Sequence, residues 1–411
     1  MTYDLGEDDV AFLRTRYGHR ALQVADELTL TPSSLVGDIG RLRARYPDHA
    51  AAVAEVVRAR RRAAGRLDFA AELIADENSV QQATAAPVAA LRAADIAARH
   101  PGGVVHDVTC SIGTELAALA EEPEIAGVIG SDLDHARLAM AQHNLEVSCG
   151  RTPRPTLLRA DALAPTSTAD VVIADPGRRG TGGRVFGIAQ VDPPLLELLA
   201  VYAGRALVVK CSPGLDYRNL RTRFGFEGQV QIVSLDGGVR EACLWTEAAG
   251  QPANRASVLR TGDDGRAHLY EVTSAEPDDL AAPGIDDWII DPDGAVIRAG
   301  LVRQYAHRHG LRQLDPHIAY LTGDRVPAAE RGFRILEQLP VTEKVLRGAL
   351  AARDCGSLEI LVRGLDVDPD RLRKKLRLKG TRPYALILTR IGRSGVAFLC
   401  EPGRRGPADP E

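Results

Sequence analysis

The chain has 411 residues, of which 45% are hydrophobic and 26% are charged. This length predicts two to four domains with substantial cores, and the composition is that of a soluble globular protein. A formal net charge of −4 argues against a protein that binds nucleic acid through a uniformly basic surface. No run of about 18 apolar residues predicts a transmembrane helix. The acidic N-terminus also lacks the form of a signal peptide, so we expect a cytoplasmic protein without a membrane partner.

The cysteines and histidines do not indicate a disulfide framework or a metal site. Six cysteines are scattered without a C-x-x-C pair, which in a chain of this length is typical of reduced cytosolic thiols. The ten histidines show no metal-ligand spacing with cysteines or carboxylates. We therefore expect no metal.

Residues 1–80 are predicted to form a helical region. Alanine, leucine and arginine dominate it, and Pro32 followed by two serines offers a helix start. Within it, the segment 50–62 combines an apolar stripe with four arginines, namely Arg58, Arg60, Arg61 and Arg62. A solvated helix face is the favoured interpretation of these arginines, and contact with RNA is the alternative.

The segment 104–115 combines a short apolar run with an acid, small residues and one glycine. The run 104–106 predicts a buried strand that ends in Asp107, and a tight turn containing Gly113 leads into an alanine- and leucine-rich helix. Such a turn presents backbone N–H groups to a ligand, and Gly113 suits a point where ligand and backbone approach closely. A dinucleotide-binding fold would need G-x-G-x-x-G here, and only one of those glycines is present.

Three further strand-like runs are also followed by an acid. Asp132, Asp161 and Asp175 come at or just after the ends of the second, third and fourth runs. Open α/β sheets bind ligands at the carboxyl edge of their parallel strands. Any one of these acids has an ordinary interpretation as a helix cap or turn former, but four in this order predict a ligand site along one sheet edge.

In this arrangement the chain resembles the class I S-adenosylmethionine (AdoMet)-dependent methyltransferases. The resemblance implies an α/β fold class with a Rossmann-like domain, whose mostly parallel seven-stranded sheet ends in an antiparallel hairpin, and it implies AdoMet as cofactor. It also implies that the first loop holds the methionine part, the second acid binds the ribose hydroxyls and the third acid lies by the adenine. The residues assigned to the cofactor in this way are Asp107, Thr109, Ser111, Gly113, Thr114, Asp132, Leu133, Asp161 and Ala162. The segment before the first strand often closes over the cofactor in this family, so Gln82 and Thr84 are further candidates.

The tip of the fourth strand, Asp175-Pro176, lies where the resemblance implies that the methyl acceptor enters, and these two residues are expected to be catalytic. Amino-directed nucleic-acid methyltransferases carry an aromatic residue two positions after this Asp-Pro pair that stacks on a flipped base. This chain instead continues with Gly177, Arg178 and Arg179. The two arginines could grip a phosphate or stack on a base of the substrate, or they could form a solvated loop pair.

Two later runs, 205–211 and 229–235, predict further strands, and 240–245 follows the Asp-Gly signal of a hairpin. Cys211, next to a lysine, resembles the nucleophile of RNA cytosine-C5 methyltransferases. The second cysteine that those enzymes usually carry is missing, and a small buried residue is the ordinary interpretation. Arg240 and Glu241 could border the substrate cleft.

The remaining chain predicts further domains after a Rossmann-like domain at 81–248. A small mixed module is expected at 249–330, an α+β domain at 331–403 and a disordered tail at 404–411. The strings 361–369 and 376–380 resemble the THUMP-like domain at the C-terminus of certain bacterial methyltransferases. The basic helix between them carries Lys374 and Lys375, which we expect to contact a substrate.

The expected function is AdoMet-dependent methyl transfer to a nucleotide of structured RNA (rRNA or tRNA), by in-line displacement at Asp175-Pro176. RNA would bind the basic C-terminal helix in a salt-dependent way. RNA is inferred as the substrate from the THUMP-like resemblance, because true THUMP domains bind structured RNA. This is an argument by association, since fold does not determine function. A protein or small-molecule acceptor and a non-catalytic AdoMet- or RNA-binding module are the alternatives. The acceptor atom and the oligomeric state stay open.

Overall fold

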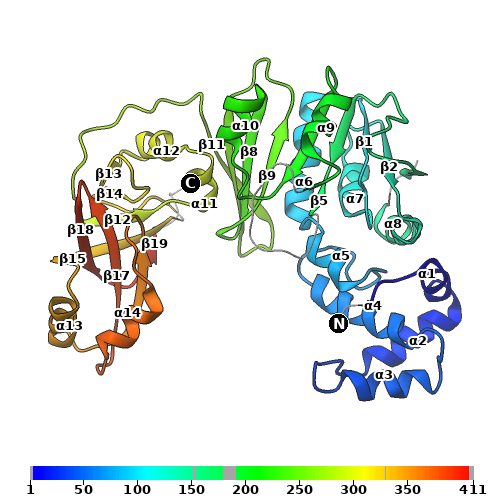
Figure 1. Ribbon diagram of the computed structural model, residues 1–411, viewed down its shortest axis with the longest axis horizontal. Coiled ribbons are helices and arrows are strands. Elements are labelled where there is room, and N and C mark those ends of the chain that lie inside the picture. Colours follow the sequence, from blue (N-terminus) through cyan, green and yellow to red (C-terminus); the bar gives the residue numbers. More distant parts are fainter. Residues whose placement is uncertain (1–2, 151–153, 179–190, 329, 407–411) are drawn as a thin grey trace. The chain divides into compact units, whose positions relative to one another are not determined.

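The computed structural model describes residues 3–150, 154–178, 191–328 and 330–406 (Figure 1). The chain divides into two compact units, Met1–Val230 with Glu241–Gln251 and Gln231–Arg240 with Pro252–Glu411. The finer division into domains expected from the sequence stays a prediction. None of the helices in the described ranges has the length and apolar character needed to cross a membrane.

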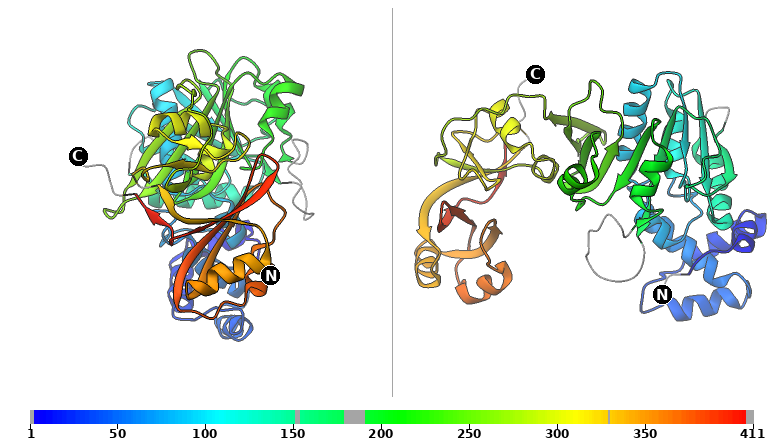
Figure 2. Two further views of the ribbon diagram at one scale, coloured as in Figure 1. Left: turned by 90° about the vertical axis from the view of Figure 1, so that its left-hand side faces the viewer. Right: turned by 45° about the horizontal axis from the view of Figure 1, so that its top comes forward.

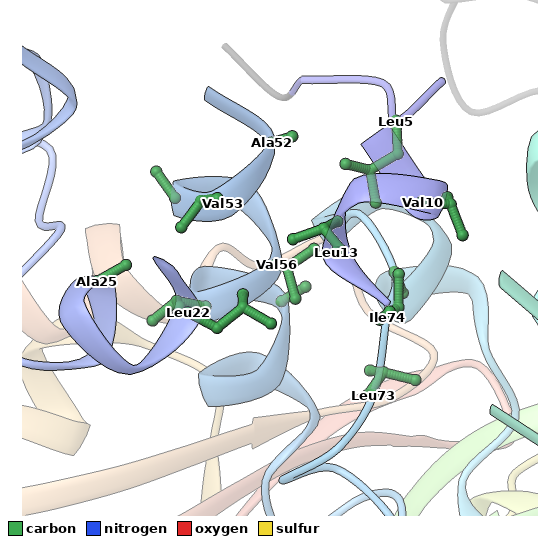
Figure 3. Close-up of a cluster of buried hydrophobic side chains, with 14 of the residues drawn as sticks. Leu5, Val10, Leu13, Leu22, Ala25, Ala52, Val53, Val56, Leu73 and Ile74 are labelled. Carbon is green, nitrogen blue, oxygen red and sulfur yellow. The ribbon is translucent and has the colours of Figure 1, made fainter. Parts of the chain in front are cut away.

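The N-terminal region is helical, as predicted. Its helices are α1 (Glu7–Leu13), α2 (Arg16–Asp26), α3 (Leu35–Arg43), α4 (Ala50–Ala63) and α5 (Glu77–Gln82). Side chains of α1, α2 and α4 point towards one another in a common core (Figure 3), which also includes Ile112 and Met140 of the following domain. The helical region therefore packs directly against the Rossmann-like domain in the first unit.

The arginines of α4 are engaged within this region. Arg61 donates hydrogen bonds to three backbone carbonyl oxygens near the end of α2, those of Asp26, Leu28 and Thr29. Arg60 donates to two more in the segment after α4, those of Glu72 and Leu73. Arg58 forms ion pairs with Glu55 and Glu77. These contacts favour a structural role for Arg58, Arg60 and Arg61.

The Rossmann-like domain alternates strands and helices in the first unit (Figure 1). In chain order its main elements are α6 (Ala86–Arg99), β1 (Val104–Asp107), α7 (Thr114–Glu121), β2 (Gly127–Asp132), α8 (His135–Ser148), β3 (Thr156–Arg159), β4 (Val171–Ala174), α9 (Leu195–Val201), β7 (Ala206–Cys211) and α10 (Tyr217–Phe224). The short strands β5 (Gly177–Arg178) and β6 (Val191–Asp192) pair with each other.

The sheet of this unit has the strand order β9-β7-β4-β1-β2-β3. The pairs β1/β2, β1/β4, β2/β3 and β4/β7 are parallel, and β9 (Gly238–Trp245) runs antiparallel to β7. The near-continuous apolar character of β4, which is buried along its whole length, is that of a strand covered on both faces. The predicted mostly parallel sheet is confirmed.

The predicted hairpin is formed by β8 (Gln229–Leu235) and β9, joined by Asp236 and Gly237. Both turn residues have left-handed φ values, 52° and 79°, which a two-residue turn of the type favoured in hairpins requires. On its other side β8 pairs with β10 (Asn254–Thr261), which in turn pairs with β11 (Ala267–Thr273), in the order β11-β10-β8. These two strands were not predicted from the sequence.

The C-terminal sheet has the order β13-β14-β12-β15-β18-β17-β16, with β19 (Arg404–Arg405) paired to β15. Its elements in chain order are β12 (Trp288–Asp291), α11 (Gly294–Arg298), α12 (Val302–His309), β13 (Arg312–Gln313), β14 (Leu321–Gly323), β15 (Arg331–Pro340), α13 (Glu343–Ala352), β16 (Cys355–Val362), α14 (Pro369–Leu376), β17 (Arg382–Ile391) and β18 (Ser394–Cys400). Leucines of α13 and α14 share a core with leucines of β17, so both helices pack on the sheet (Figure 2). Residues 404–405, expected in the disordered tail, lie in β19, and 407–411 lie outside the described residues.

Candidate active site

The parallel pairing places the four predicted acids along the carboxyl edge of the sheet. Asp107 and Asp132 are the last residues of β1 and β2, and Asp175 directly follows β4. Asp161 comes two residues after the end of β3. Since β1, β2, β3 and β4 are joined by parallel registers, the ends of these strands meet at one edge, where α/β sheets bind ligands.

The loop between β1 and α7 has the left-handed turn that the single glycine predicts. Ser111 and Gly113 have φ values of 47° and 83°, and Gly113 is the N-cap of α7. A Cβ on Gly113 would lie 3.2 Å from the Cβ of Ala141 on α8, so glycine is also needed for packing between the loop and that helix. Thr114 then begins α7, whose first turn presents backbone N–H groups without partners in the helix.

Asn144 on α8 holds this loop from behind. Its side chain is fully buried, and its amide nitrogen donates hydrogen bonds to the carbonyl oxygens of Ile112, at 3.0 Å, and Ile74, at 3.1 Å. Its amide oxygen accepts a bond from the Ile74 N–H at 2.9 Å. One side chain therefore connects the glycine loop to the segment between α4 and α5.

Asp132 is held by the backbone on both carboxylate oxygens. The N–H of Ser111 donates to Oδ2 at 3.1 Å, and the N–H of Asp134 donates to Oδ1 at 2.9 Å. Each carboxylate oxygen can accept a second hydrogen bond, so the group is oriented and still able to bind a diol. The neighbouring Leu133 is 60% exposed, an apolar surface against which a flat ring can pack.

Asp107 is buried, with 3% of its surface exposed. Its Oδ1 accepts a hydrogen bond from the N–H of Thr109 at 3.0 Å. Burial raises the pKa of Asp107 to about 7, against the lowering effect of the Thr109 N–H bond. A cationic group placed beside this carboxyl would favour its ionised form, which is the property expected of an acid that binds an amino group.

Asp161 and Ala162 lie in a turn after β3. The exposed Asp161 accepts a hydrogen bond from the N–H of Leu163 at 2.9 Å, so its ordinary role as a turn former is fulfilled. Ala162 is buried, and its carbonyl oxygen accepts a bond from the hydroxyl of Tyr202 at 2.8 Å. Contact of either residue with an adenine stays a prediction.

The tip of β4 is connected to the first loop and to β7. The N–H of Asp175 donates to the Thr109 hydroxyl at 2.6 Å. The Asp175 carboxylate accepts a hydrogen bond from the Lys210 ammonium, also at 2.6 Å, and the next residue, Pro176, is buried. Lys210 donates a second hydrogen bond to the hydroxyl of Thr84. Thr84, a candidate from the segment before β1, is therefore connected to Asp175 through Lys210.

A buried ion-pair network, which the sequence analysis missed, lies next to Lys210. Arg92 on α6 is 2% exposed and donates to Glu115 at 2.6 Å and to Glu241 at 2.6 Å. The same guanidinium contacts the thiol of Cys243 at 2.7 Å. Although burial opposes ionisation, Arg92 and Lys210 lower the pKa of Glu241. A sequence signal was present, because Arg92 lies four residues after Val88 and four before Ile96, on the buried stripe of α6.

Cys211 does not have the surroundings of a reactive thiolate. Burial raises the pKa of the Cys211 thiol well above its ordinary value, and the nearby carboxylates of Asp175 and Glu241 raise it further. The adjacent Lys210 directs its ammonium to Thr84 and Asp175. The structure therefore favours the interpretation of Cys211 as a packing residue.

The predicted substrate residues are placed as follows. Arg178 belongs to β5, and Arg179 lies outside the described residues. Lys374 and Lys375 are exposed on α14 in the second unit, and the Lys375 ammonium is 3.8 Å from a carboxylate oxygen of Glu343. The role of each in substrate binding stays a prediction.

The residues at the sheet edge fit AdoMet. An oriented carboxylate with free lone pairs suits the ribose diol, an exposed leucine suits the base, and a buried acid suits the amino group. In this fit Asp132 and Leu133 would hold the nucleoside, and Asp107 with the loop from Thr109 to Thr114 would hold the methionine part.

Comparison with known proteins identifies the family. Residues 330–402 match the family model described as THUMP domain-like, and residues 6–63 match a domain of unknown function, DUF8688. Relatives in Mycobacterium tuberculosis strains CDC 1551 and H37Rv, each named an uncharacterised S-adenosylmethionine-dependent methyltransferase, are 49% identical over 375 residues, covering 88% of this chain and 100% of the relative. A crystal structure described as that of a methyltransferase from Porphyromonas gingivalis W83 aligns with a TM-score of 0.71 at 21% identity, over 98% of this chain and 99% of the other, which shows a shared fold.

The identity to the mycobacterial relatives extends over their whole length, and the structure supplies the sheet edge that AdoMet requires. The chain therefore belongs to the S-adenosylmethionine-dependent methyltransferases, uses AdoMet as its cofactor and carries a THUMP-like domain in its C-terminal part.

Proposed function

We propose that this methyltransferase modifies a nucleotide of structured RNA, either rRNA or tRNA, at the tip of β4. The observation that carries the proposal is the THUMP domain-like match over residues 330–402. Its helix α14 and the loop after it expose a cluster of cations suited to phosphate contacts: Arg371, Lys374, Lys375, Arg377 and Lys379. The net charge of −4 does not oppose this, because the cations are concentrated locally.

The geometry supports a role for each of the proposed cofactor residues. Asp132 accepts hydrogen bonds from the two ribose hydroxyls on the lone pairs that its backbone partners leave free. Asp107 pairs with the amino group, and the N–H groups at the start of α7 face the carboxylate of the methionine part. Asp161 and Ala162 border the base.

The residues at the tip of β4 position the methyl acceptor. Bound AdoMet provides a methyl group already activated on a sulfonium, so the protein needs to hold an acceptor in line and remove one proton. Asp175 accepts a hydrogen bond from the acceptor and thereby orients it, and Pro176 forms the wall of the site beside it. Arg178 and Arg179 contact a phosphate or base of the RNA.

The test is methylation of total RNA by the full-length protein with tritiated AdoMet. RNA from a strain that lacks the gene should accept label, RNA from the parent strain should not, and nucleoside mass spectrometry should identify one modified nucleoside. Asp175→Asn should reduce incorporation to a small residual rate while AdoMet binding persists. Label in a protein or small-molecule fraction, with none in RNA, would refute RNA as the substrate and select the other acceptor class.

The contribution of α14 is tested separately. The double variant Lys374→Glu/Lys375→Glu should weaken RNA binding and reduce its dependence on salt, because each lost phosphate contact releases one fewer counterion. AdoMet affinity, measured by isothermal titration calorimetry, should be unchanged. RNA binding equal to that of the wild type across a salt series would contradict this assignment.

A further inference from the structure

Lys210 places a buried ammonium next to the carboxylate of Asp175. The side chain lies on β7, which pairs in parallel with β4, and only 8% of it is exposed. Its Nζ is 2.6 Å from Oδ2 of Asp175, 2.5 Å from the hydroxyl of Thr84 and 3.5 Å from Oε2 of Glu115. An ammonium has three N–H donors, and these three oxygens can each receive one.

The neighbouring charges direct this ammonium towards Asp175. Glu115 and Glu241, two other carboxylates near Lys210, are both bonded to the buried guanidinium of Arg92. Moving the ammonium onto either one would compete with those short bonds and leave Asp175 without its cation. Because the ammonium is itself buried and must keep its partners, the competition with Arg92 for the two glutamates favours the present contact of Lys210 with Asp175.

Asp175 is held by hydrogen bonds to neighbouring residues, while part of its side chain is exposed. Its N–H is bonded to Thr109, and its carboxylate contacts Lys210 through Oδ2 alone. Yet 42% of the Asp175 side chain is exposed, compared with 8% for Lys210. The buried partner therefore restricts the rotation of a carboxylate that still reaches the surface of the site.

We propose that Lys210, anchored on Thr84, is a positioning residue that fixes one carboxylate oxygen of Asp175 so that the other receives the hydrogen bond of the methyl acceptor. This inference rests on the proposed role of Asp175. Without the ammonium, the carboxylate samples other rotamers, and the acceptor is presented to the methyl group less often. Lys210 acts on the acceptor only through Asp175, so its loss should lower kcat by more than the modest change in AdoMet affinity that follows from its lowering of the Asp107 pKa.

The first experiment needs no acceptor. A double-mutant cycle of Lys210→Met and Asp175→Asn is measured by urea unfolding of the full chain. Lys210→Met should lower the folding equilibrium constant at least about tenfold more in the presence of Asp175 than in the Asp175→Asn background, because only with Asp175 does the change break the ion pair between the ammonium and this carboxylate. Equal effects in both backgrounds would overturn the inference.

The second experiment uses the same variants in methyl transfer to RNA from the deletion strain. Lys210→Met should reduce kcat about tenfold to a hundredfold, in line with the loss of one charge-assisted hydrogen bond. It should cause little further loss when Asp175→Asn is already present. Lys210→Arg should restore part of the rate, and Lys344→Met, a change at an exposed lysine on α13, should leave it unchanged.

The outcomes separate the two proposals. A wild-type chain that methylates no RNA refutes the proposed function, while the unfolding cycle still decides whether Lys210 and Asp175 act as a pair. A kcat loss of the same size with and without Asp175 would overturn the positioning role. A matched change at Thr84, Thr84→Val, should reduce kcat in the same direction by a smaller factor.

Discussion

Acidification should weaken AdoMet binding through Asp107. The pKa of this carboxyl is raised to about 7 in the free protein, mainly by burial, with smaller contributions from Glu115 and Asp175, and against the lowering effects of the Thr109 N–H and Lys210. The proposed partner of Asp107 is the amino group of AdoMet, which pairs only with the ionised carboxylate. Below the pKa, binding must therefore be coupled to the release of a proton from Asp107.

The size of the effect follows from this pKa. Well below the pKa, each further pH unit reduces the ionised fraction about tenfold, which corresponds to about 1.4 kcal/mol of binding free energy. We therefore expect the dissociation constant of AdoMet to rise about fivefold between pH 7 and pH 6, and about fifteenfold between pH 7 and pH 5.5, because only about half of the Asp107 carboxyls are ionised at the pKa itself. The amino group of AdoMet should stay protonated in this window, because α-amino groups titrate near about 7.7–8.0.

The assay is isothermal titration calorimetry between pH 5.5 and 7.0 in pairs of buffers with different ionisation enthalpies. The buffer pairs should report close to one proton released per AdoMet bound at pH 5.5, and a smaller fraction of a proton at pH 7.0. Asp107→Asn should bind AdoMet more weakly and with a flat pH dependence. The reasoning is refuted if the wild-type affinity is constant across this range, or if Asp107→Asn keeps the wild-type pH dependence.

Three further substitutions test other parts of the site. Asp132→Asn should weaken AdoMet binding in calorimetry by about 1.5–3 kcal/mol, because neutral hydrogen bonds replace charge-assisted ones to the ribose; unchanged affinity would exclude Asp132 as the ribose ligand. Cys211→Ala should retain methyl transfer within about twofold, since burial raises the pKa of its thiol, and complete loss of transfer would restore the nucleophile interpretation. Asn144→Leu should lower the free energy of unfolding by about 1–3 kcal/mol in urea, because buried backbone groups of Ile74 and Ile112 lose their partners, whereas an unchanged midpoint would show that water replaces the amide.

Much of the fold and the candidate cofactor edge could be predicted from local patterns. A short apolar run that ends in an acid marks the end of each of the first strands, and Asp236-Gly237 marks the hairpin, because both patterns report the conformation of adjacent residues. The basic helix α14 and the α+β character of residues 331–403 were also predicted. The extra strands β10 and β11 were missed, since the composition of that stretch suggested a separate module.

The network of buried charges next to Asp175 could not be predicted from local patterns. Lys210 is 35 residues from Asp175 and 126 residues from Thr84, and Arg92 is 149 residues from Glu241. No local pattern reports contacts over such separations. Arg92 did stand on an apolar stripe, which indicated a buried cation, but the identity of its partners depended on which helix and strand ends met.

The sequence by itself determined where the strands end, which acids stand at those ends and that the chain resembles AdoMet-dependent methyltransferases. These properties depend on short-range periodicity and on the residue types at turns. Only the tertiary structure decided that the arginines Arg58, Arg60 and Arg61 join the N-terminal helices, that Cys211 is surrounded by carboxylates and that Asp175 is held by Lys210. The physical reason is that the environment of a charged or nucleophilic group is set by whichever distant elements pack around it.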